Sequence, residues 1–318
     1  MSLAPTPPSA INTRATFTTS VDRMSALSQR IADTQEAVST GRRINRPSDD
    51  PVASARAATL RRELAQSATT SRNIDAATRR LNSAEITLAA MGDLVLRARE
   101  LALAGTNATI SADDRAVMAQ EVENLAASLQ ALAETRDVDG VPLFSGSRTT
   151  GPVYAPDAIG TRIWQGEGQP PAIALGTTTI ETGLTGPQVF GTTTPPSPER
   201  PDGTADLFAS MAALADALAD PDPETRTPAL ESALAALETH SASLTDAQAL
   251  LGTRAARLTS EQDRLAAQTL SSQIDLSRLE DTDMASSIAE LQRLLNVLEA
   301  AQASFARTAN QSLWDLLR

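Results

Sequence analysis

The sequence predicts a mainly α-helical fold, an elongated antiparallel bundle whose terminal regions form a coiled coil, with a small β-rich or irregular inserted domain. Three observations lead to this fold class. Only 3% of the 318 residues are aromatic, whereas a compact core of that size normally holds more rings. Apolar residues recur at alternating steps of three and four over long stretches, as in coiled coils. Most of the glycine and half of the proline fall within residues 146–204.

The sequence of the first third of the chain predicts an N-terminal tail followed by two helices. Residues 1–13 offer little to bury, and we expect them to be disordered. A helix then runs from about residue 14 and ends before Gly41, which suits the left-handed turn after a helix. A second helix begins with Asp50 as its cap and Pro51 in its first position, and it continues to about residue 104. Its clearest apolar stripe comprises Leu81, Ala84, Leu88, Met91, Val95 and Ala98.

The middle of the chain predicts a third helix and the insert. Ser111 and Asp114 have the spacing of a capping box. Residues 137–144 combine an Asp-Gly turn with short extended flanks, which indicates a small hairpin. The glycine and proline of residues 146–204 then make helix improbable, so this insert is either β-rich or irregular.

The last third of the chain returns to helix. Prolines 221, 223 and 228 interrupt it near its start, and a long helix with a seven-residue apolar frame follows. Residues 281–283 form a break, where Thr282 or Asp283 can cap a terminal helix. The insert is therefore flanked by two helical arms that fold back on each other, which brings both chain ends together.

Both terminal helices carry an apolar seam that needs a partner. The C-terminal seam runs from Met284 to Leu316 in steps of four and three, and the N-terminal seam runs from Phe17 to Val38. An isolated helix buries nothing on such a stripe. We therefore expect folding of the two ends to depend on neighbouring subunits. The candidate assembly residues are Phe17, Val21, Met24, Ile31, Val38, Ile288, Leu291, Leu295, Leu298, Phe305, Leu313, Trp314 and Leu316.

Composition argues against an enzyme, a cofactor and a metal site. The chain has no Cys and no Lys, which removes thiolate and Schiff-base chemistry. Its one histidine, His240, has no second His or Cys beside which to bind zinc, and we interpret it as a surface helix residue.

Charge and hydropathy bear on the possible partners. The net charge of −12 argues against nucleic acid. No apolar run approaches the roughly 20 residues of a membrane span. The N-terminus lacks the apolar segment of a usual secretory signal, so the protein either stays inside or leaves by a route that reads no such signal.

Three segments resemble a known family. Residues 39–51, Ser-Thr-Gly-Arg-Arg-Ile-Asn-Arg-Pro-Ser-Asp-Asp-Pro, resemble the N-terminal signature of the flagellin superfamily. Residues 143–146 are similar to the segment before that family's variable domain, and residues 300–317 resemble its C-terminal helix. The form of residues 45–51 is more similar to members at the hook-filament junction than to filament flagellins. The signature-loop residues are Gly41, Arg42, Asn45, Arg46, Pro47, Asp49, Asp50 and Pro51.

The resemblance implies a non-enzymatic structural subunit of the bacterial flagellum, an adaptor that joins hook to filament. It implies secretion through the flagellar export channel to the extracellular flagellum. The implied partners are further copies of the chain in a ring or helical assembly, hook-side and filament-side axial proteins (flagellin and other hook-associated proteins), and a cytoplasmic export chaperone on the C-terminal helix.

The resemblance also implies a domain organisation. Residues 14–50 and 279–318 would be inner, assembly-dependent helices. Residues 51–146 and 205–278 would form a helical rod domain, and residues 147–204 would be a variable surface insert.

Two other functions remain open. The chain could be filament flagellin itself, the main filament subunit. It could also be a flagellin-like surface protein whose threonine-rich insert, with Trp164, recognises a glycan.

Overall fold

The computed structural model describes residues 13–156, 162–176, 178–192 and 205–316, so the predicted disordered tail lies almost wholly outside the described residues. The helices in these ranges are α1 (Thr13–Thr40), α2 (Pro51–Gly105), α3 (Ala112–Ala133), α4 (Gly186–Phe190), α5 (Leu207–Ala219), α6 (Pro223–Glu280) and α7 (Met284–Leu316). The strands are β1 (Tyr154–Pro156), β2 (Arg162–Trp164), β3 (Ala172–Leu175) and β4 (Thr178–Glu181). The predicted fold class, mainly α with paired long helices and a small insert, is confirmed.

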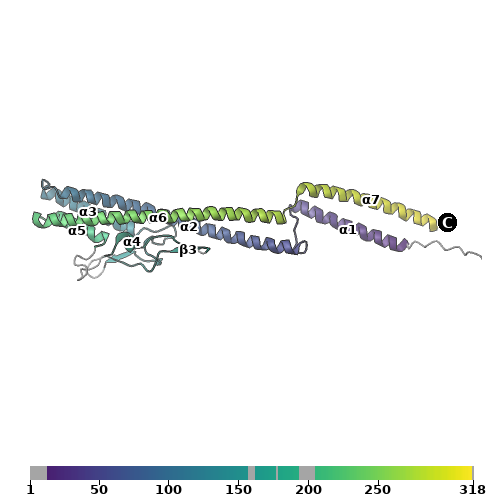
Figure 1. Ribbon diagram of the computed structural model, residues 1–318, viewed down its shortest axis with the longest axis horizontal. Coiled ribbons are helices and arrows are strands. Elements are labelled where there is room, and N and C mark those ends of the chain that lie inside the picture. Colours follow the sequence, from purple (N-terminus) through teal and green to yellow (C-terminus); the bar gives the residue numbers. More distant parts are fainter. Residues whose placement is uncertain (1–12, 157–161, 177, 193–204, 317–318) are drawn as a thin grey trace, which may run out of the picture. The chain divides into compact units, whose positions relative to one another are not determined.

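The chain folds into two compact units. One consists of residues up to 66 together with residues from 268 onward, and the other consists of residues 67–267. Each boundary falls inside a long helix, α2 or α6. In the first unit α1 packs against α7, and in the second α3 packs against α5 (Figure 1).

The second unit is a helical bundle in which α2, α3, α5 and α6 share one core. The stripe predicted on α2, from Leu81 to Ala98, is buried along its whole length. Burying a side chain such as Leu or Met stabilises a fold by roughly 1.5–3 kcal/mol, so this core contributes strongly to the stability of the unit. The other helices supply Val122 and Leu129, Met211 and Leu214, and Leu237 and Leu244.

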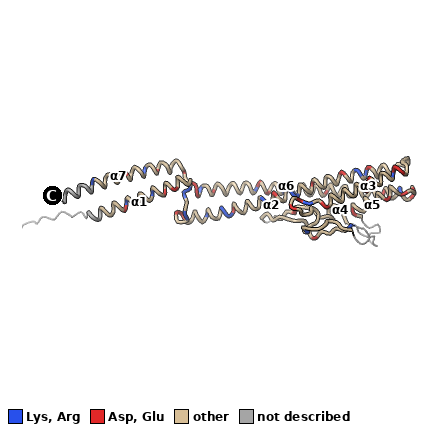
Figure 2. Tube along the Cα trace, turned by 180° about the vertical axis from the view of Figure 1, so that it is seen from behind, with Lys and Arg blue, Asp and Glu red and all other residues tan. Residues whose placement is uncertain are grey.

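Surface ion pairs also link the bundle helices. Arg97 of α2 reaches Glu121 of α3 at 2.7 Å, and Arg99 of α2 reaches Glu238 of α6 at 2.7 Å. Figure 2 shows charges of both signs along these helices. All four side chains are substantially exposed, so such pairs favour one register more than they add stability.

Side-chain caps fix the start of two bundle helices. Asp206 Oδ1 accepts the Ala209 N–H at 2.8 Å at the start of α5. At the start of α3, Ser111 Oγ accepts the Asp114 N–H at 3.1 Å. The Asp114 carboxylate instead accepts the Ser111 hydroxyl proton at 2.7 Å, so only half of the predicted capping box forms.

One local prediction needs correction. Proline 228 does not interrupt α6, which begins at Pro223 and continues through it. It lies close enough to the helix start that its missing N–H removes only one early hydrogen bond.

The hairpin predicted at residues 137–144 is present in a minimal form. The Asp137 N–H donates to the Val141 carbonyl at 2.9 Å and the Leu143 N–H donates to the Thr135 carbonyl at 3.0 Å, on either side of an antiparallel bridge between Arg136 and Pro142. Pro142 has no N–H with which to extend the ladder.

The insert is neither wholly β-rich nor wholly irregular. It contains two antiparallel hairpins, β1–β2 and β3–β4, with irregular connections between them. Its core is aromatic: the Phe190 ring lies 5.7 Å from that of Phe144 and 5.1 Å from that of Phe208, between centroids. Because Phe208 belongs to α5, the insert and the bundle share one core.

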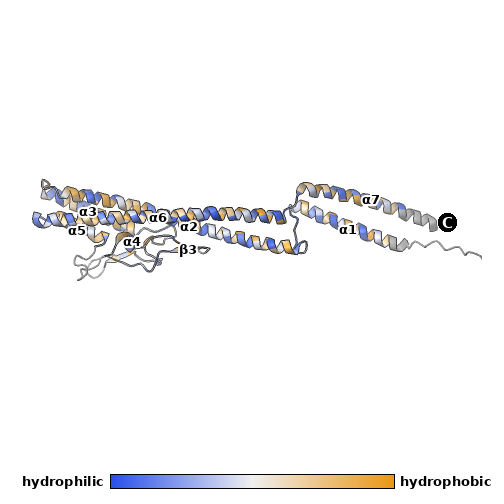
Figure 3. Ribbon diagram, in the orientation of Figure 1, coloured by the Kyte–Doolittle hydropathy of each residue, from blue (hydrophilic) through white to orange (hydrophobic). Residues whose placement is uncertain are grey.

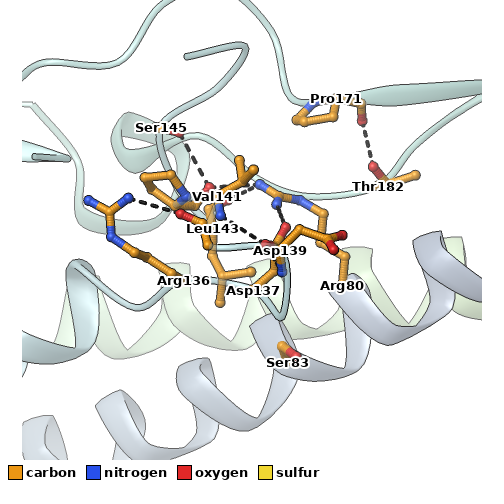
Figure 4. Close-up of polar contacts among 12 residues, drawn as sticks. Arg80, Ser83, Arg136, Asp137, Asp139, Val141, Leu143, Ser145, Pro171 and Thr182 are labelled. Carbon is orange, nitrogen blue, oxygen red and sulfur yellow. Dashed lines mark hydrogen bonds and ion pairs between the residues drawn. The ribbon is translucent and has the colours of Figure 1, made fainter. Parts of the chain in front are cut away.

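Three charged side chains, one each from α2 and α6 and one from the residue after α3, attach the insert and the loop that precedes it. Arg80 of α2 pairs with Asp137 and donates to the Pro142 carbonyl at 2.8 Å and the Leu143 carbonyl at 3.2 Å (Figure 4). Glu134, just after α3, accepts the N–H groups of Val153 and Tyr154, each at 2.9 Å.

Arg254 of α6 makes the third attachment, to Glu181 and to the Gly183 carbonyl. Each of the three side chains therefore satisfies backbone or carboxylate groups of the insert or of the loop that precedes it.

His240 is buried, so its predicted place on the surface is wrong. Its side chain lies between α6 and α5, and its Nε2 is 3.1 Å from Ser210 Oγ. It follows Leu237 by three positions and precedes Leu244 by four, which puts it on the buried face of α6. The prediction failed because histidine is a polar residue type and gives no apolar signal, although its spacing matches the buried stripe of α6.

Replacing Arg80 should destabilise the second unit strongly. In Arg80→Ala, Asp137 and two loop carbonyls lose their partner, and breaking such a buried pair costs about 3–5 kcal/mol. Chemical unfolding followed by circular dichroism measures the change. Arg79→Ala, an exposed neighbour on the same helix, is the control and should alter stability little. Equal stability of the two variants would contradict the attachment described above.

Stability should fall below about neutral pH because of His240. Burial lowers the pKa of His240 below 6.5, against an opposing effect of the Asp206 charge. The unfolded chain therefore takes up a proton at a pH where the folded chain does not, so the free energy of unfolding decreases as pH falls through 6.5. Urea denaturation at several pH values, for the native chain and His240→Gln, measures this. If the free energy of unfolding of His240→Gln fell with pH as steeply as that of the native chain, the assignment to His240 would be refuted.

Candidate assembly surface

The helices α1 and α7 pack against each other as an antiparallel pair (Figure 1). The end of α1, which leads into residues 41–50, lies beside the start of α7, which follows residues 281–283. One stripe on each helix faces the other, and we call these residues the inner stripe. Ile31 and Leu294 are its most buried members, at 7% and 5% exposed. The inner stripe comprises Phe17, Ser20, Met24, Leu27, Ile31, Thr34 and Val38 of α1, and Met284, Ser287, Leu291, Leu294, Leu298, Ala301 and Phe305 of α7.

The far end of the pair is marked by two rings. The Phe17 and Phe305 centroids lie 5.0 Å apart and the rings are tilted to each other. Phe17 is nevertheless 52% exposed, and Met284 at the other end of the inner stripe is 42% exposed. The pair therefore leaves apolar surface uncovered at both of its ends.

A second set of apolar residues lies beside the inner stripe, and we call it the flank. It consists of Val21, Ile288 and Leu295, which are 42%, 42% and 43% exposed. Each follows an inner-stripe residue by one position, which rotates it by about 100° from the seam. In an antiparallel pair this rotation places all three on the same side. Figure 3 shows the alternation of hydrophobic and hydrophilic positions along both helices.

The predicted assembly residues thus separate into two groups. Met24, Ile31, Val38, Leu291, Leu298 and Phe305 are buried or half-buried in the pair, whereas Val21, Ile288 and Leu295 lie on the exposed flank. The backbone of α7 continues to Leu316, but the side chains of Leu313, Trp314 and Leu316 lie outside the described residues.

Sequence reasoning missed Leu27 and Leu294, two members of the inner stripe. Both are apolar and both fit a four-three pattern set one position from the predicted one. The two patterns share every second residue, so the spacing alone did not choose between them.

The signature loop connects α1 to α2 and is held by its own aspartates. Gly41 has a left-handed backbone, with φ of 70°, directly after α1 ends. Asp49 Oδ2 accepts the N–H groups of Asn45 at 3.1 Å and Arg46 at 2.8 Å. Asp50 Oδ1 accepts the Ala53 N–H at 3.0 Å and so caps α2.

The remaining loop residues have varied surroundings. Arg46 pairs with Glu36 of α1 at 3.3 Å, whereas Arg42 and Pro47 are exposed. On the C-terminal side, Asp283 Oδ1 accepts the Ala285 N–H at 3.0 Å. Asp283 is therefore the cap of α7, which settles the choice between Thr282 and Asp283.

Charged groups around the pair are mutually compensated. The Ala53 N–H, and then Arg43, lower the pKa of Asp50. Arg293 lowers the pKa of Glu290 on α7, with a smaller effect from Arg30 on α1. The Arg43–Asp50 pair lies within the loop and the Arg293–Glu290 pair lies within α7, so of these charges only Arg30 acts between α1 and α7, and its effect is small at this exposed position.

The chain matches two models of one family. The bacterial flagellin N-terminal helical region matches residues 11–149, and the bacterial flagellin C-terminal helical region matches residues 234–317. Together these ranges contain α1, α2, α3, α7 and most of α6. The chain belongs to the bacterial flagellin family. This is a family of structural proteins and not of enzymes.

Similar proteins within the flagellin family cover this chain to different extents. Flagellar hook-associated protein 3 of Escherichia coli is 28% identical over 290 residues, which is 88% of this chain and 91% of that protein. Flagellin FlaB1 of Treponema pallidum is 31% identical, but over 131 residues, 41% of this chain and 44% of that protein. A solved structure of flagellar hook-associated protein 3 from Legionella pneumophila has the same fold, with a TM-score of 0.62, 16% identity, and coverage of 70% of this chain and 98% of that one.

Two kinds of feature are absent from the described residues of this flagellin-family chain. Among them no helix has the length and apolar character to cross a membrane. In the same residues there is no group of three or more His, Cys, Asp or Glu side chains placed to hold a metal ion.

Leu294 and Leu295 are adjacent residues that should behave oppositely when truncated. Leu294→Ala removes a buried inner-stripe side chain, for which a loss of about 2 kcal/mol or more is expected. Leu295→Ala removes a flank side chain that is 43% exposed and should leave the pair nearly unchanged. Hydrogen exchange of α1 and α7 amides in the single chain measures how much each substitution destabilises the helix pair. If Leu295→Ala opened the pair as much as Leu294→Ala, the inner stripe would be misassigned.

Proposed function

We propose that this chain is a structural subunit that joins the hook of the bacterial flagellum to its filament. The observation that carries this proposal is the apolar flank of the α1–α7 pair. A seam between two helices buries one stripe on each, and the exposed Val21, Ile288 and Leu295 leave a neighbouring subunit a second apolar surface to cover.

The extent of similarity favours a junction subunit over filament flagellin. Similarity to flagellar hook-associated protein 3 of Escherichia coli extends over 88% of the chain, whereas similarity to flagellin FlaB1 covers 41%. A protein of the junction must contact hook-side proteins at one end and filament-side proteins at the other. We therefore propose both, with further copies of the chain, as partners.

In this proposal the assembly residues act at two stages. The inner stripe pairs α1 with α7, and the flank residues, with Leu313, Trp314 and Leu316, are covered by neighbouring subunits. The terminal segments 14–50 and 279–318 would be the inner, assembly-dependent domain, residues 51–146 and 205–278 the rod domain, and residues 147–204 the surface insert. Neighbours would complete the order of the terminal helices.

Two further parts of the proposal rest on the family resemblance. The chain would leave the cell through the flagellar export channel and reach the extracellular flagellum. Before export, a cytoplasmic chaperone would cover the apolar surface of α7. The exposed Ile288 and Leu295 support this, because uncovered apolar stripes promote aggregation.

The glycan-binding alternative gains little support from the insert. The Trp164 ring is half-buried, and its indole N–H donates to the Phe144 carbonyl at 2.9 Å. Gly166 and Gly186 lie so close to the ring that a side chain at either would overlap it. Trp164 therefore packs within the protein and is a poor platform for a sugar.

Deletion and localisation in the source bacterium test the proposal. Without this chain, hooks should form without filaments, and intact flagellin should accumulate unpolymerised in the medium. Labelled chain should appear as one short band beside the hook. Label along the whole filament, or loss of the main filament protein itself, would instead identify the chain as filament flagellin.

Leu295→Asp then tests the role of the flank. The charge should leave the single chain folded, because Leu295 is exposed, but it should prevent incorporation at the junction. Asn296→Asp, at an exposed position next to it, is the charge-matched control and should assemble. Normal filaments with Leu295→Asp would contradict a role for the flank.

A further inference from the structure

The start of α5 packs directly against the insert. The Phe208 ring lies 4.9 Å from the Tyr154 ring and 5.1 Å from the Phe190 ring, between centroids. Both partner rings belong to the insert, and both are almost completely buried. Phe208 is itself buried, so the insert excludes water from the first turn of α5.

The rest of α5 packs against the long helices of the second unit. Ser210 Oγ lies 3.1 Å from His240 Nε2 of α6. Near the end of α5, Leu218 lies so close to Gly105 of α2 that a side chain at Gly105 would overlap it. Met211 and Leu214, between these positions in α5, are wholly buried. One short helix therefore joins the insert to α2 and α6.

Neither α5 nor the insert has enough structure to be stable without packing partners. The helix α5 has 13 residues, and an isolated helix of this length is marginal in water. The sheets in the described part of the insert, β1–β2 and β3–β4, have two strands each, and isolated hairpins are also marginal. The aromatic contacts above make α5 and the insert partners of each other.

The family models separate the same elements from the rest of the second unit. The matched ranges are residues 11–149 and 234–317, so α5 and nearly all of the insert fall between them. The helices α2 and α3 and most of α6 fall inside these ranges. Two ion pairs, Arg97–Glu121 and Arg99–Glu238, connect α2 to α3 and to α6 without involving α5. These three helices thus have contacts that do not depend on α5 or the insert.

We propose that α5 and the described part of the insert form one cooperative unit that opens from α2, α3 and α6 as a whole while those three helices stay packed. We call this unit the cover, and it comprises residues 147–156, 162–176, 178–192 and 207–219. The faces of α3 and α6 on which α5 lies become accessible to other molecules only when the cover opens. Although α5 lies in the range of the rod domain, it opens with the insert. The inference concerns the second unit alone and does not depend on the proposed function.

Arg254 holds the cover at a point remote from α5. Its guanidinium pairs with Glu181 and donates to the Gly183 carbonyl, both in the insert. It follows His240 by 14 residues, which is about 21 Å along α6 from the contact with α5. The substitution Arg254→Ala therefore weakens the attachment of the insert without removing any contact of α5.

Hydrogen exchange of the full-length chain tests whether the insert and α5 open together. The reporter amides are Gln165, which donates to the Val153 carbonyl within the insert, Leu214 within α5, and Leu88 within α2. In Arg254→Ala, exchange of Gln165 and Leu214 should accelerate by the same factor, about tenfold or more, because both amides exchange through one opening. Exchange of Leu88 should keep its native rate. Arg257→Ala, an exposed position three residues later on α6, is the matched control and should change none of the three rates.

A reciprocal variant weakens the cover from α5. Met211→Ala removes a wholly buried side chain of α5 and should accelerate exchange of Gln165, in the insert, by about a hundredfold. Asp216→Ala, at an exposed position of the same helix, is its control and should leave Gln165 unchanged.

Three results would overturn the proposal. If Leu214 kept its native rate in Arg254→Ala while Gln165 accelerated, α5 would be held independently of the insert. If Leu88 accelerated as much as Leu214, the whole second unit would open at once. An unchanged rate for Gln165 in folded Met211→Ala would show that the insert does not need α5. The first two results remain measurable in the milder Arg254→Ala even if Met211→Ala fails to fold.

Discussion

A pair of helices can bury only one stripe on each partner, and the apolar surface of α1 and α7 is wider than that stripe. Leu294 is buried between the helices while its neighbour Leu295 is 43% exposed, so two adjacent leucines meet different environments. The first supports pairing within the chain, whereas the second is open to contact with another surface. Two overlapping four-three patterns on one helix thus supply a buried stripe and an exposed one side by side.

The order of elements along the chain makes such an arrangement possible. Backbone hydrogen bonds of Arg43 with Glu280 and of Thr282 with Gly41 join the end of α1 to the start of α7. The Arg61–Glu280 pair connects the same place to the start of α2 and the end of α6. Four helix ends are thereby gathered in one small set of hydrogen bonds. A signature of Gly, Arg and paired Asp residues suits this place: Gly41 makes the left-handed turn, Asp49 closes the loop, and Asp50 starts the next helix.

Sequence periodicity predicted the fold class, the helix order and the buried stripe of α2, because these follow from local spacing. It did not choose between two overlapping patterns on α1 and α7, since Leu27 and Leu294 differ from the predicted positions by one residue. The burial of His240 also escaped prediction, because a histidine between Leu237 and Leu244 adds no apolar signal to the stripe and its contact with Ser210 of α5 leaves no pattern in the spacing of α6. Contacts such as that of Arg80 with the Leu143 carbonyl connect a helix to an irregular loop. They produce no periodic pattern in the sequence, so spacing could not predict them.

The exclusive use of arginine as the basic residue has a consistent structural role. Irregular segments expose carbonyl groups that no ladder satisfies, and a planar guanidinium can donate to two of them at once. Arg80 does so for Pro142 and Leu143, and Arg136 does so for Gly140 and Gly151. Arg226 likewise bridges the Asp220 and Pro221 carbonyls between α5 and α6. A lysine ammonium has three N–H donors, but they lie on one freely rotating nitrogen and would hold two carbonyls less directionally. In a fold made of long helices, the loops between the helices contain the carbonyl groups that need side-chain donors. These arginines donate to carbonyls in those loops.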